Sequence, residues 1–518
     1  MDAENRIMIR HTRAYREKLL ADPYRPRYHF AIPDDDGRPG DPNGMFWANG
    51  EYHLMYLYRR DGGDFCWGHM SSVDLLHWRQ HSDALKGGPN DNGCFSGGAF
   101  VDDDGTAWLS YWIFNDREQT HGRNAGIGLA RSAPPYETWE RLPDAVIPST
   151  EWGICDEMTP DGNTIHLGCA DPSNIWKRDG VYYMQTGNLL VLNKYGRDAD
   201  SPAVYRGDWT ELFASEDLMR WKHLGRFYER AADDSWTDAT EDDMCPSYLP
   251  LPPNRDGGTP SGKMLQLFIA HNKGCQYYIG HEEGVFFRPE KHGRMSWVDN
   301  TFFAPEACVD GRGRQIMFAW LNDNIEDDFQ KYGWSGVYSL PRALWLNEDG
   351  DLGIAPTAEV EALSYLTAVL PDRTIADENL QAPLPIGHAR CCRISFDADV
   401  RDASQAGVEA LISQSGGRGV LIYYDAVRQE LVFDPNGCDT LGRGAVERAP
   451  LMLQPGEPLR LTVYVDNAVV EVFANDRQAI SRRAYTDPVT AGHANLFARG
   501  RAVFSSIQTA AMGAANPY

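Results

Sequence analysis

The sequence lacks any apolar run of the roughly 20 residues that a membrane-spanning helix needs. Its first residues, Met1 to Arg6, carry no apolar signal-peptide core, so we expect a cytoplasmic protein, although a secreted chain whose leader had been removed would look the same. Basic residues are scarce: 49 Lys and Arg stand against 74 Asp and Glu, for a formal net charge of −25. This balance argues against nucleic acid and anionic membranes as partners and favours a neutral or cationic ligand.

The signatures of several chemistries are also missing. The ten cysteines form no CxxC pair, which favours free thiols in a reducing compartment. There is no GxSxG elbow and no phosphate-cradling glycine loop, so serine-hydrolase chemistry and nucleotide binding are disfavoured. A DxDxDG loop is absent too, which makes calcium a weak competitor for the acidic residues, and we expect no metal or other cofactor.

What the chain does contain is a repeated hairpin. At 518 residues it is too long for one ordinary core. A strand, an Asx-Gly turn and a second strand recur in five units that start at residues 41, 97, 171, 245 and 304. Five such units predict an all-β fold with a five-bladed β-propeller. The openings of the units then meet at the centre, although they lie far apart in the sequence.

The rest of the chain suggests three further segments. Helix-compatible spacing predicts an N-terminal helical segment over residues 1–27, ahead of a propeller over 28–355. Residues 356–386 read as a linker, because Pro, Asp and Ala dominate most of this stretch. Alternating apolar residues and regular turns predict a C-terminal antiparallel β-sandwich over 387–518.

Carboxylates stand at or near three of the five openings. Asp41 opens the first unit, Asp171 opens the third, and the run Glu241, Asp242 and Asp243 precedes the fourth. Glycoside cleavage uses carboxylates in this way: one attacks or stabilises the sugar's reacting carbon and another protonates the leaving oxygen. Burial and mutual proximity would raise one pKa enough to hold a proton near neutral pH. Turn capping by Asp41 and Asp171, or a calcium site, are the alternatives.

Several motifs, in this order, resemble glycoside hydrolase family 32, the group of invertases, inulinases and levanases. They are Gly40-Asp41-Pro42-Asn43-Gly44, the stretch 67–78 beginning Trp67-Gly68-His69, Cys94-Phe95-Ser96-Gly97-Gly98, Asp171-Pro172, Cys245-Pro246 and the stretch 336–342. The resemblance spans about Tyr28 to Pro488. It implies a five-bladed propeller followed by a β-sandwich, and hydrolysis of β-fructofuranosides with retention and without a catalytic metal.

The resemblance also implies roles for single residues. Asp41 corresponds to the nucleophile that forms a fructosyl-enzyme, and Asp171 to a transition-state stabiliser that holds sugar hydroxyls. The acid/base is expected to be a Glu directly before Cys245, but Met244 stands there. We therefore assign the acid/base to Glu241, with Asp242 and Asp243 as alternatives.

Two more positions depart from the family pattern. Ala170 stands where the family usually has an Arg that binds fructose, and Leu57 stands where it tends to have Gln. Both leave the identity of the furanoside open. Predicted substrate contacts are Asn43, Trp67, Phe95, Ser96 and Arg294. Blade packing is the alternative for the two aromatic residues, turn hydrogen bonding is the alternative for Ser96, and Arg294 is a candidate replacement for the missing Arg.

We therefore predict a retaining hydrolase that cleaves a β-fructofuranosidic bond in sucrose, a fructo-oligosaccharide or a short fructan. Its partner would be a small carbohydrate, and a homo-oligomer is compatible with the sequence. Three alternatives stay open. They are a fructosyltransferase, a hydrolase of another furanoside such as an arabinofuranoside (because of Ala170 and Leu57), and a non-catalytic carbohydrate-binding protein (because of Met244).

Overall fold

The computed structural model describes residues 3–32, 37–60, 63–116, 120–231, 234–323, 328–376, 382–413, 418–435, 438, 444–487 and 491–516. The chain divides into two compact units. One comprises Pro39–Trp320 with Ala343–Leu352, and the other comprises Met1–Arg38, Leu321–Arg342 and Gly353–Tyr518. None of the helices in the described ranges is long and apolar enough to cross a membrane.

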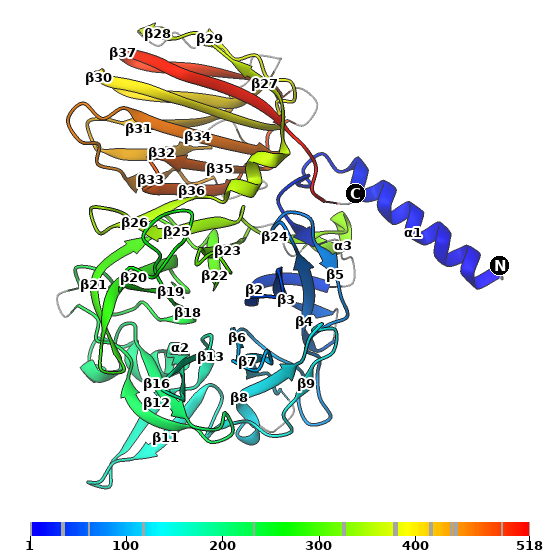
Figure 1. Ribbon diagram of the computed structural model, residues 1–518, viewed down its shortest axis with the longest axis vertical. Coiled ribbons are helices and arrows are strands. Elements are labelled where there is room, and N and C mark those ends of the chain that lie inside the picture. Colours follow the sequence, from blue (N-terminus) through cyan, green and yellow to red (C-terminus); the bar gives the residue numbers. More distant parts are fainter. Residues whose placement is uncertain are drawn as a thin grey trace. The chain divides into compact units, whose positions relative to one another are not determined.

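Five antiparallel sheets surround a common centre like the blades of a propeller (Figure 1). The first contains β2 (Gly37–Ala48), β3 (Glu51–Arg60), β4 (Phe65–Ser72) and β5 (Arg79–Gln80). The second contains β6 (Ala99–Val101), β7 (Ala107–Ile113), β8 (Gly122–Ser132), β9 (Glu140–Arg141) and β10 (Ile147–Ser149). The third contains β13 (Ala170–Pro172), β14 (Trp176–Arg178), β15 (Val181–Gly187), β16 (Thr210–Ser215) and β17 (Lys222–Arg226).

The two remaining sheets complete the ring. The fourth contains β18 (Met244–Pro250), β19 (Met264–Ala270), β20 (Gly274–Glu283) and β21 (Phe286–Arg294). The fifth contains β22 (Phe302–Val309), β23 (Gln315–Leu321), β25 (Arg342–Leu346) and β26 (Leu352–Pro356). A separate hairpin, β11 (Ile154–Met158) with β12 (Thr164–Gly168), precedes the third blade. Short helices α2 (Leu189–Val191), η1 (Leu192–Gly196) and η2 (Ala203–Tyr205) follow β15.

The five predicted unit openings lie at the innermost strands β2, β6, β13, β18 and β22 (Figure 1). The turn chemistry that predicted the hairpins is present. Asn49 and Gly50 have φ of 53° and 87°, and Asp179 and Gly180 have φ of 51° and 80°. Two successive positive φ values define the turn that matches the twist of paired strands, and Asn-Gly and Asp-Gly adopt it most readily. The prediction of a five-bladed propeller is confirmed.

Apolar side chains fill the spaces between blades. Between the first two blades, Met55, Trp67 and Leu109 are fully buried in one cluster. Between the third and fourth, Phe227, Tyr248 and other aromatic residues form another cluster. Side chains near the centre also connect neighbouring blades, because each forms a hydrogen bond with the backbone of the next blade. These pairs are Asn43 with Gly97, Ser110 with Ser173, Asn174 with both the N–H and the C=O of Tyr248, and Glu306 with Met45. These ties fix the ends of the inner strands, where the predicted catalytic residues lie.

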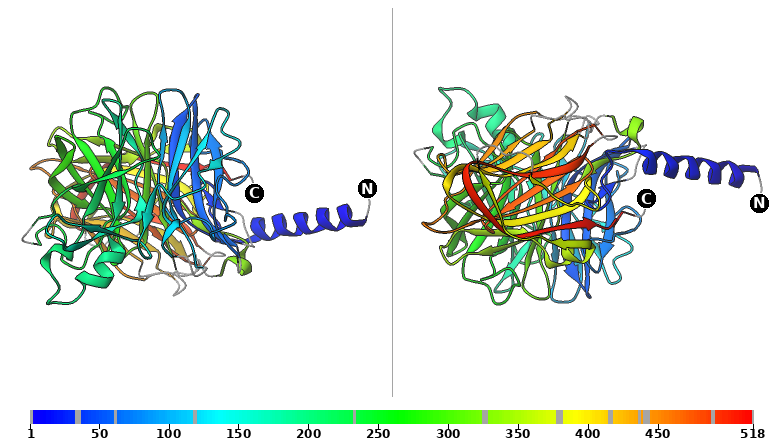
Figure 2. Two further views of the ribbon diagram at one scale, coloured as in Figure 1. Left: turned by 90° about the horizontal axis from the view of Figure 1, so that it is seen from below. Right: turned by 90° about the horizontal axis from the view of Figure 1, so that it is seen from above.

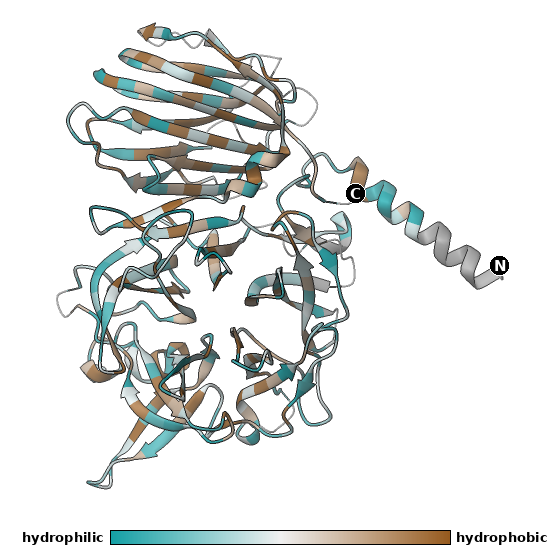
Figure 3. Cartoon of the chain, in the orientation of Figure 1, coloured by the Kyte–Doolittle hydropathy of each residue, from teal (hydrophilic) through white to brown (hydrophobic). Residues whose placement is uncertain are grey.

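The other unit contains an eleven-stranded antiparallel sheet, which forms the C-terminal sandwich. Its strands are β27 (Ser364–Val369), β28 (Arg373–Ala376), β29 (Ala382–Pro383), β30 (Cys391–Ser413), β31 (Val420–Asp425), β32 (Glu430–Asp434), β33 (Glu447–Pro450), β34 (Leu459–Asp466), β35 (Val469–Ala474), β36 (Gln478–Arg483) and β37 (Ala491–Met512). Buried and part-exposed residues alternate along the first half of β30, and Figure 3 shows the matching alternation of hydropathy.

The structure differs from the sequence prediction at the linker. Residues 364–376 form β27 and β28, both of which pair with β37, so this part of the predicted linker belongs to the sheet. The remaining elements are α1 (Ala3–Ala21), β1 (Ala31–Ile32), α3 (Phe329–Tyr332), β24 (Ser335–Val337) and η4 (Ala358–Leu363). The predicted N-terminal helix is α1, which both views in Figure 2 show as one straight helix.

A buried ionic cluster lies in this second unit. Asp466 accepts the backbone N–H groups of Arg27, Tyr28 and His29, and the His29 imidazole lies between Asp466 and Glu471, at 3.0 and 3.1 Å. Burial alone would lower the pKa of His29, but the hydrogen bonds to the two carboxylates outweigh it and raise the pKa to about 9. Residues near the N-terminus are thereby joined to β34 and β35.

Candidate active site

A residue with positive φ, followed by a proline, recurs at the start of three inner strands. Asp171, Cys245 and Ala304 have φ of 34°, 48° and 46°, and Pro172, Pro246 and Pro305 follow them. A positive φ at a residue with a β-carbon costs about 1–3 kcal/mol, and such strain is concentrated at functional sites. The three residues therefore occupy equivalent positions in successive blades, and two of them carry reactive side chains.

The carboxylates of Asp41 and Asp171 both lie close to the sulfur atom of Cys245. The Cys245 thiol lies 3.4 Å from Oδ2 of Asp171 and 3.9 Å from Oδ2 of Asp41. Ser96 donates its hydroxyl to the same Asp41 oxygen at 2.6 Å. The Asn43 amide donates to the Asp41 carbonyl at 3.0 Å and accepts the N–H of Gly97. Residues from the first four blades thus build a single site around two carboxylates.

Burial and mutual repulsion control the charge of this pair. Burial raises the pKa of Asp41, although the Ser96 hydrogen bond and the positive charge of His271 offset part of the increase. Burial, followed by the charge of Asp41, raises the pKa of Asp171 to about 7. Because like charges in one site resist ionising together, a proton is held on the pair at a pH where an exposed Asp has lost it.

A third group, His271, lies directly after β19. Because β18 and β19 are antiparallel, with Met244 opposite Ile269, the end of β19 returns to the end of the blade where Cys245 lies. Asp242 holds the histidine twice: one carboxylate oxygen accepts the backbone N–H at 3.1 Å, and the other lies 2.7 Å from Nδ1. The ring packs edge-on against Phe303, with centroids 5.7 Å apart.

His271 is electrostatically part of the site. Burial opposes its protonation, but the hydrogen bond that it donates to Asp242 and the charges of Asp242, Asp171 and Asp41 together raise its pKa. Conversely, its charge lowers the pKa of Asp41 and Asp171. The side chain is still 43% exposed, whereas the Asp242 side chain is fully buried. A histidine ring with one open edge therefore accompanies the two carboxylates.

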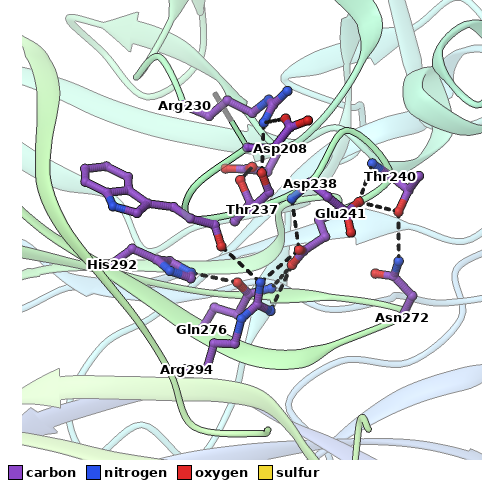
Figure 4. A network of polar contacts seen from close by, with 12 residues as sticks. Asp208, Arg230, Thr237, Asp238, Thr240, Glu241, Asn272, Gln276, His292 and Arg294 are labelled. Atoms are coloured by element: carbon purple, nitrogen blue, oxygen red, sulfur yellow. Dashed lines mark hydrogen bonds and ion pairs between the residues drawn. The ribbon is translucent and has the colours of Figure 1, made fainter. Parts of the chain in front are cut away.

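Glu241, the predicted acid/base, is held by other partners (Figure 4). Its carboxylate accepts hydrogen bonds from both terminal nitrogens of Arg294, at 3.0 and 2.8 Å, and from Gln276 at 2.6 Å. It also accepts the N–H of Asp238 at 3.0 Å, and the residue is 1% exposed. These partners engage both oxygens of the carboxylate, and the hydrogen bonds from Arg294 are of the strong, charge-assisted kind. The predicted role of Glu241 is not favoured by these contacts.

The Asp243 carboxyl group also forms its hydrogen bonds with residues outside the Asp41–Asp171 site. Its Oδ2 lies 2.8 Å from the Tyr228 hydroxyl and 3.1 Å from the Gln266 amide, and that same hydroxyl lies 2.8 Å from Asp208. Burial, with the nearby Asp208 and Asp242, keeps the pKa of Asp243 well above its ordinary value. This fully buried pair of carboxyls belongs to the blade interior.

The predicted substrate contacts divide into two groups. Asn43 and Ser96 contact Asp41, as described above. Trp67 is fully buried between blades and donates its ring N–H to the Phe95 carbonyl at 3.2 Å, so it packs rather than lining an accessible surface. Phe95 packs with Phe65, Phe114, Trp112 and Trp152. Arg294 pairs with Glu241.

The three departures from the family pattern are all apolar here. Ala170 and Met244 are 0% and 1% exposed, and Leu57 is partly buried. In the described ranges, no group of three His, Cys, Asp or Glu side chains is placed to hold a metal ion.

Comparison with known proteins agrees with this architecture. The model of the glycosyl hydrolases family 32 N-terminal domain matches residues 35–356, and that of the family 32 C-terminal domain matches residues 366–511. The chain belongs to glycosyl hydrolase family 32. It is a hydrolase of the β-fructofuranosidase type, as the resemblance implied.

Individual family 32 relatives are distant. Sucrose-6-phosphate hydrolase of Zymomonas mobilis is 27% identical over 95% of this chain and 93% of its own length, and fructan 6-exohydrolase of Beta vulgaris is 26% identical over 90% and 82%. Beta-fructofuranosidase, insoluble isoenzyme 4, of Oryza sativa is 27% identical, and the chain covers 60% of its length. Among solved structures, fructan 1-exohydrolase IIa from Cichorium intybus superposes with a TM-score of 0.77 at 20% identity, covering 95% of this chain and 98% of that one. These similarities establish the fold and leave the substrate open.

Sequence reasoning missed two features of this site: the contact of the Cys245 thiol with both carboxylates, and the presence of His271. Cys245 was noted only as part of a motif. His271 follows an apolar strand that pairs with the strand after Cys245, so the hairpin itself was the available signal.

Proposed function

We propose that this protein hydrolyses the β-fructofuranosidic bond of sucrose, a fructo-oligosaccharide or a short fructan, with retention of configuration. One observation carries the proposal: Asp41 and Asp171 share a site in which a single thiol reaches both carboxylates. Asp41 attacks the anomeric carbon and forms a fructosyl-enzyme, while Asp171 binds sugar hydroxyls and stabilises the developing positive charge.

The surroundings of Asp41 suit a nucleophile. Its Oδ2 is held by Ser96, which leaves the other carboxylate oxygen available for attack. A substitution to Asn would keep the shape of the side chain and remove the attacking oxygen anion. We therefore expect Asp41→Asn to lose activity on sucrose and on fructo-oligosaccharides by several orders of magnitude while keeping its thermal unfolding temperature.

A matched control is Asp179→Asn. Asp179 is an exposed turn residue in the third blade with a φ of 51°, a conformation that Asn adopts equally well. This variant should keep full activity. NMR of the first-formed fructose anomer tests retention; initial release of the opposite anomer, or full turnover by Asp41→Asn, would contradict the proposal.

Ala170 favours one alternative substrate. It leaves no charged side chain directly before Asp171, where the family usually has an Arg that binds fructose, so a contact that favours fructose is missing. A panel of aryl furanosides separates the two cases: preference for an arabinofuranoside over the fructofuranoside would replace the fructosyl substrate. Absence of product from every furanoside would instead support a carbohydrate-binding protein.

A further inference from the structure

The proposed cleavage needs a proton donor, and three residues just ahead of Cys245 in the sequence, Glu241, Asp243 and Met244, do not offer one. Met244 carries a thioether, which holds no proton at any accessible pH. Glu241 is paired with Arg294 and Gln276, and Asp243 is enclosed with Tyr228 and Gln266. A departing sugar alkoxide is a strong base, so without a donor the reaction would be restricted to activated leaving groups.

We propose that His271, held in place by Asp242, is the general acid and base of this site. This assignment rests on the proposed function, because it specifies how the same reaction moves its proton. Asp242 fixes Nδ1 and the backbone N–H of His271, so the ring has one orientation. In the described part of the chain, Nε2 has no hydrogen-bond partner, and the side chain is 43% exposed.

Asp242 also sets the chemistry of the ring. A buried carboxylate on Nδ1 fixes the tautomer in which Nδ1 carries a hydrogen, and so it leaves Nε2 as the atom that gains and loses a proton. Because Asp242 is 0% exposed and its two oxygens are both used by His271, it acts as a positioning residue and does not touch the substrate.

The electrostatics of the site match a donor that starts protonated. The charged groups that act on His271 are Asp242, Asp171 and Asp41, all of them acidic, and together they raise its pKa. When Asp41 becomes an ester and loses its charge, one of these stabilising charges disappears and the proton is held less tightly. The loss of that charge favours the transfer at the moment the leaving group needs it.

The proposed steps balance as follows. An oxygen of Asp41 bonds to the anomeric carbon, the bond from that carbon to the leaving oxygen breaks, and the Nε2 proton of His271 moves to that oxygen. In the second step a water oxygen bonds to the anomeric carbon, one water proton moves to Nε2, and the ester bond to Asp41 breaks. Aspartate and imidazolium are both restored.

The test compares leaving groups. His271→Asn places an amide donor near the former Nδ1, which keeps a partner for Asp242, but it removes Nε2. We expect kcat/KM for sucrose to fall by about 10²–10⁴-fold, the usual range for removal of a general acid. On 4-nitrophenyl β-fructofuranoside, whose leaving group needs no proton, we expect a much smaller loss in the first step. Azide should restore turnover by replacing water in the second step and yield fructosyl azide.

His281→Asn is the matched control. His281 lies in the same blade, is 48% exposed and contacts Glu290 through Nδ1 at 2.8 Å, so it shares the histidine–carboxylate geometry away from the site. Its replacement should leave both substrates unaffected. Asp242→Asn should move the alkaline limb of the kcat/KM profile to lower pH, because His271 loses the partner that stabilises its protonated form; a merely structural role would lower kcat without moving that limb.

Two results would overturn the assignment. Equal losses on sucrose and on the nitrophenyl substrate in His271→Asn would mean that His271 does not protonate the leaving group. Leaving-group dependence and azide rescue in Asp171→Asn, and not in His271→Asn, would move the acid to Asp171. Failure of the wild-type enzyme to release fructose from either substrate would instead remove the proposed function, and the proton role with it.

Discussion

Cys245 donates its thiol hydrogen to Asp171 across adjacent blades, at 3.4 Å, and the two residues occupy the same bent position before a proline in β18 and β13. The propeller thus places an acceptor in one blade opposite a donor in the next. Burial and Asp41 raise the pKa of Asp171, whereas the contact with Cys245 lowers it. The thiol therefore helps the Asp171 carboxylate to ionise.

Replacement of this thiol should be visible in the pH profile. In Cys245→Ala, Asp171 loses a donor that stabilises its anion, so its pKa rises and the acidic limb of kcat/KM on sucrose moves to higher pH. Cys245→Ser keeps a hydrogen-bond donor and should show a smaller displacement. An acidic limb that stays in place in both variants would mean that Asp171 need not be ionised for activity.

Asp171 should also make folding stability depend on pH. Its pKa is about 7 in the folded protein, against an ordinary value of 3.8 for an exposed Asp, so the folded state binds the proton more tightly. The contribution of this single group to the free energy of unfolding is then highest below about pH 4 and is lost as pH rises through 7. Asp171→Asn removes the penalty and should raise the unfolding temperature at pH 8 more than at pH 4.

The expected gain at pH 8 is on the order of a few kcal/mol, because one pKa unit corresponds to about 1.4 kcal/mol. Differential scanning fluorimetry of both proteins across this range is sufficient. Asp179→Asn serves again as an exposed control in the same blade, and it should show no such trend. A difference between Asp171→Asn and wild type that stays constant from pH 4 to 8 would contradict the raised pKa.

The pair of Arg294 and Glu241 distinguishes packing from substrate binding. Arg294→Ala leaves the Glu241 carboxylate, which is 1% exposed, without its charged partner, and breaking a buried ion pair costs about 3–5 kcal/mol. We expect a lower unfolding temperature with KM for sucrose nearly unchanged. The double variant Glu241→Gln with Arg294→Met should recover much of the stability. A raised KM at unchanged stability would instead support the sequence-based role of Arg294 in binding sugar.

Part of this fold and site could be predicted from the sequence, and part could not. Turn residues such as Asn49-Gly50 and the recurring proline are local signals, so the blades and the meeting of Asp41 with Asp171 followed from them. The partners of Glu241 depend on Gln276 and Arg294, which come from two other strands of the fourth blade, and no local pattern indicates that pairing. His271 was missed for a similar reason: its role depends on strand pairing and not on a motif.

The buried His29 gives a last prediction, in the unit with the C-terminal sheet. Its pKa is about 9 in the folded protein, against an ordinary value of 6.5 for an exposed His. The imidazolium therefore stabilises this unit fully below pH 6.5 and progressively less as pH rises through 9. The contribution is on the order of a few kcal/mol, since a pKa unit is worth about 1.4 kcal/mol. Thermal unfolding of wild type and His29→Gln at pH 6, 8 and 10 should show a difference in unfolding temperature that becomes smaller as the pH rises.

The exposed His77, paired with Asp74 at 2.8 Å, is the control. His77→Gln should change the unfolding temperature little at any of these pH values, because surface pairs contribute little. A difference for His29→Gln that widens above pH 9 would mean that His29 is neutral between Asp466 and Glu471.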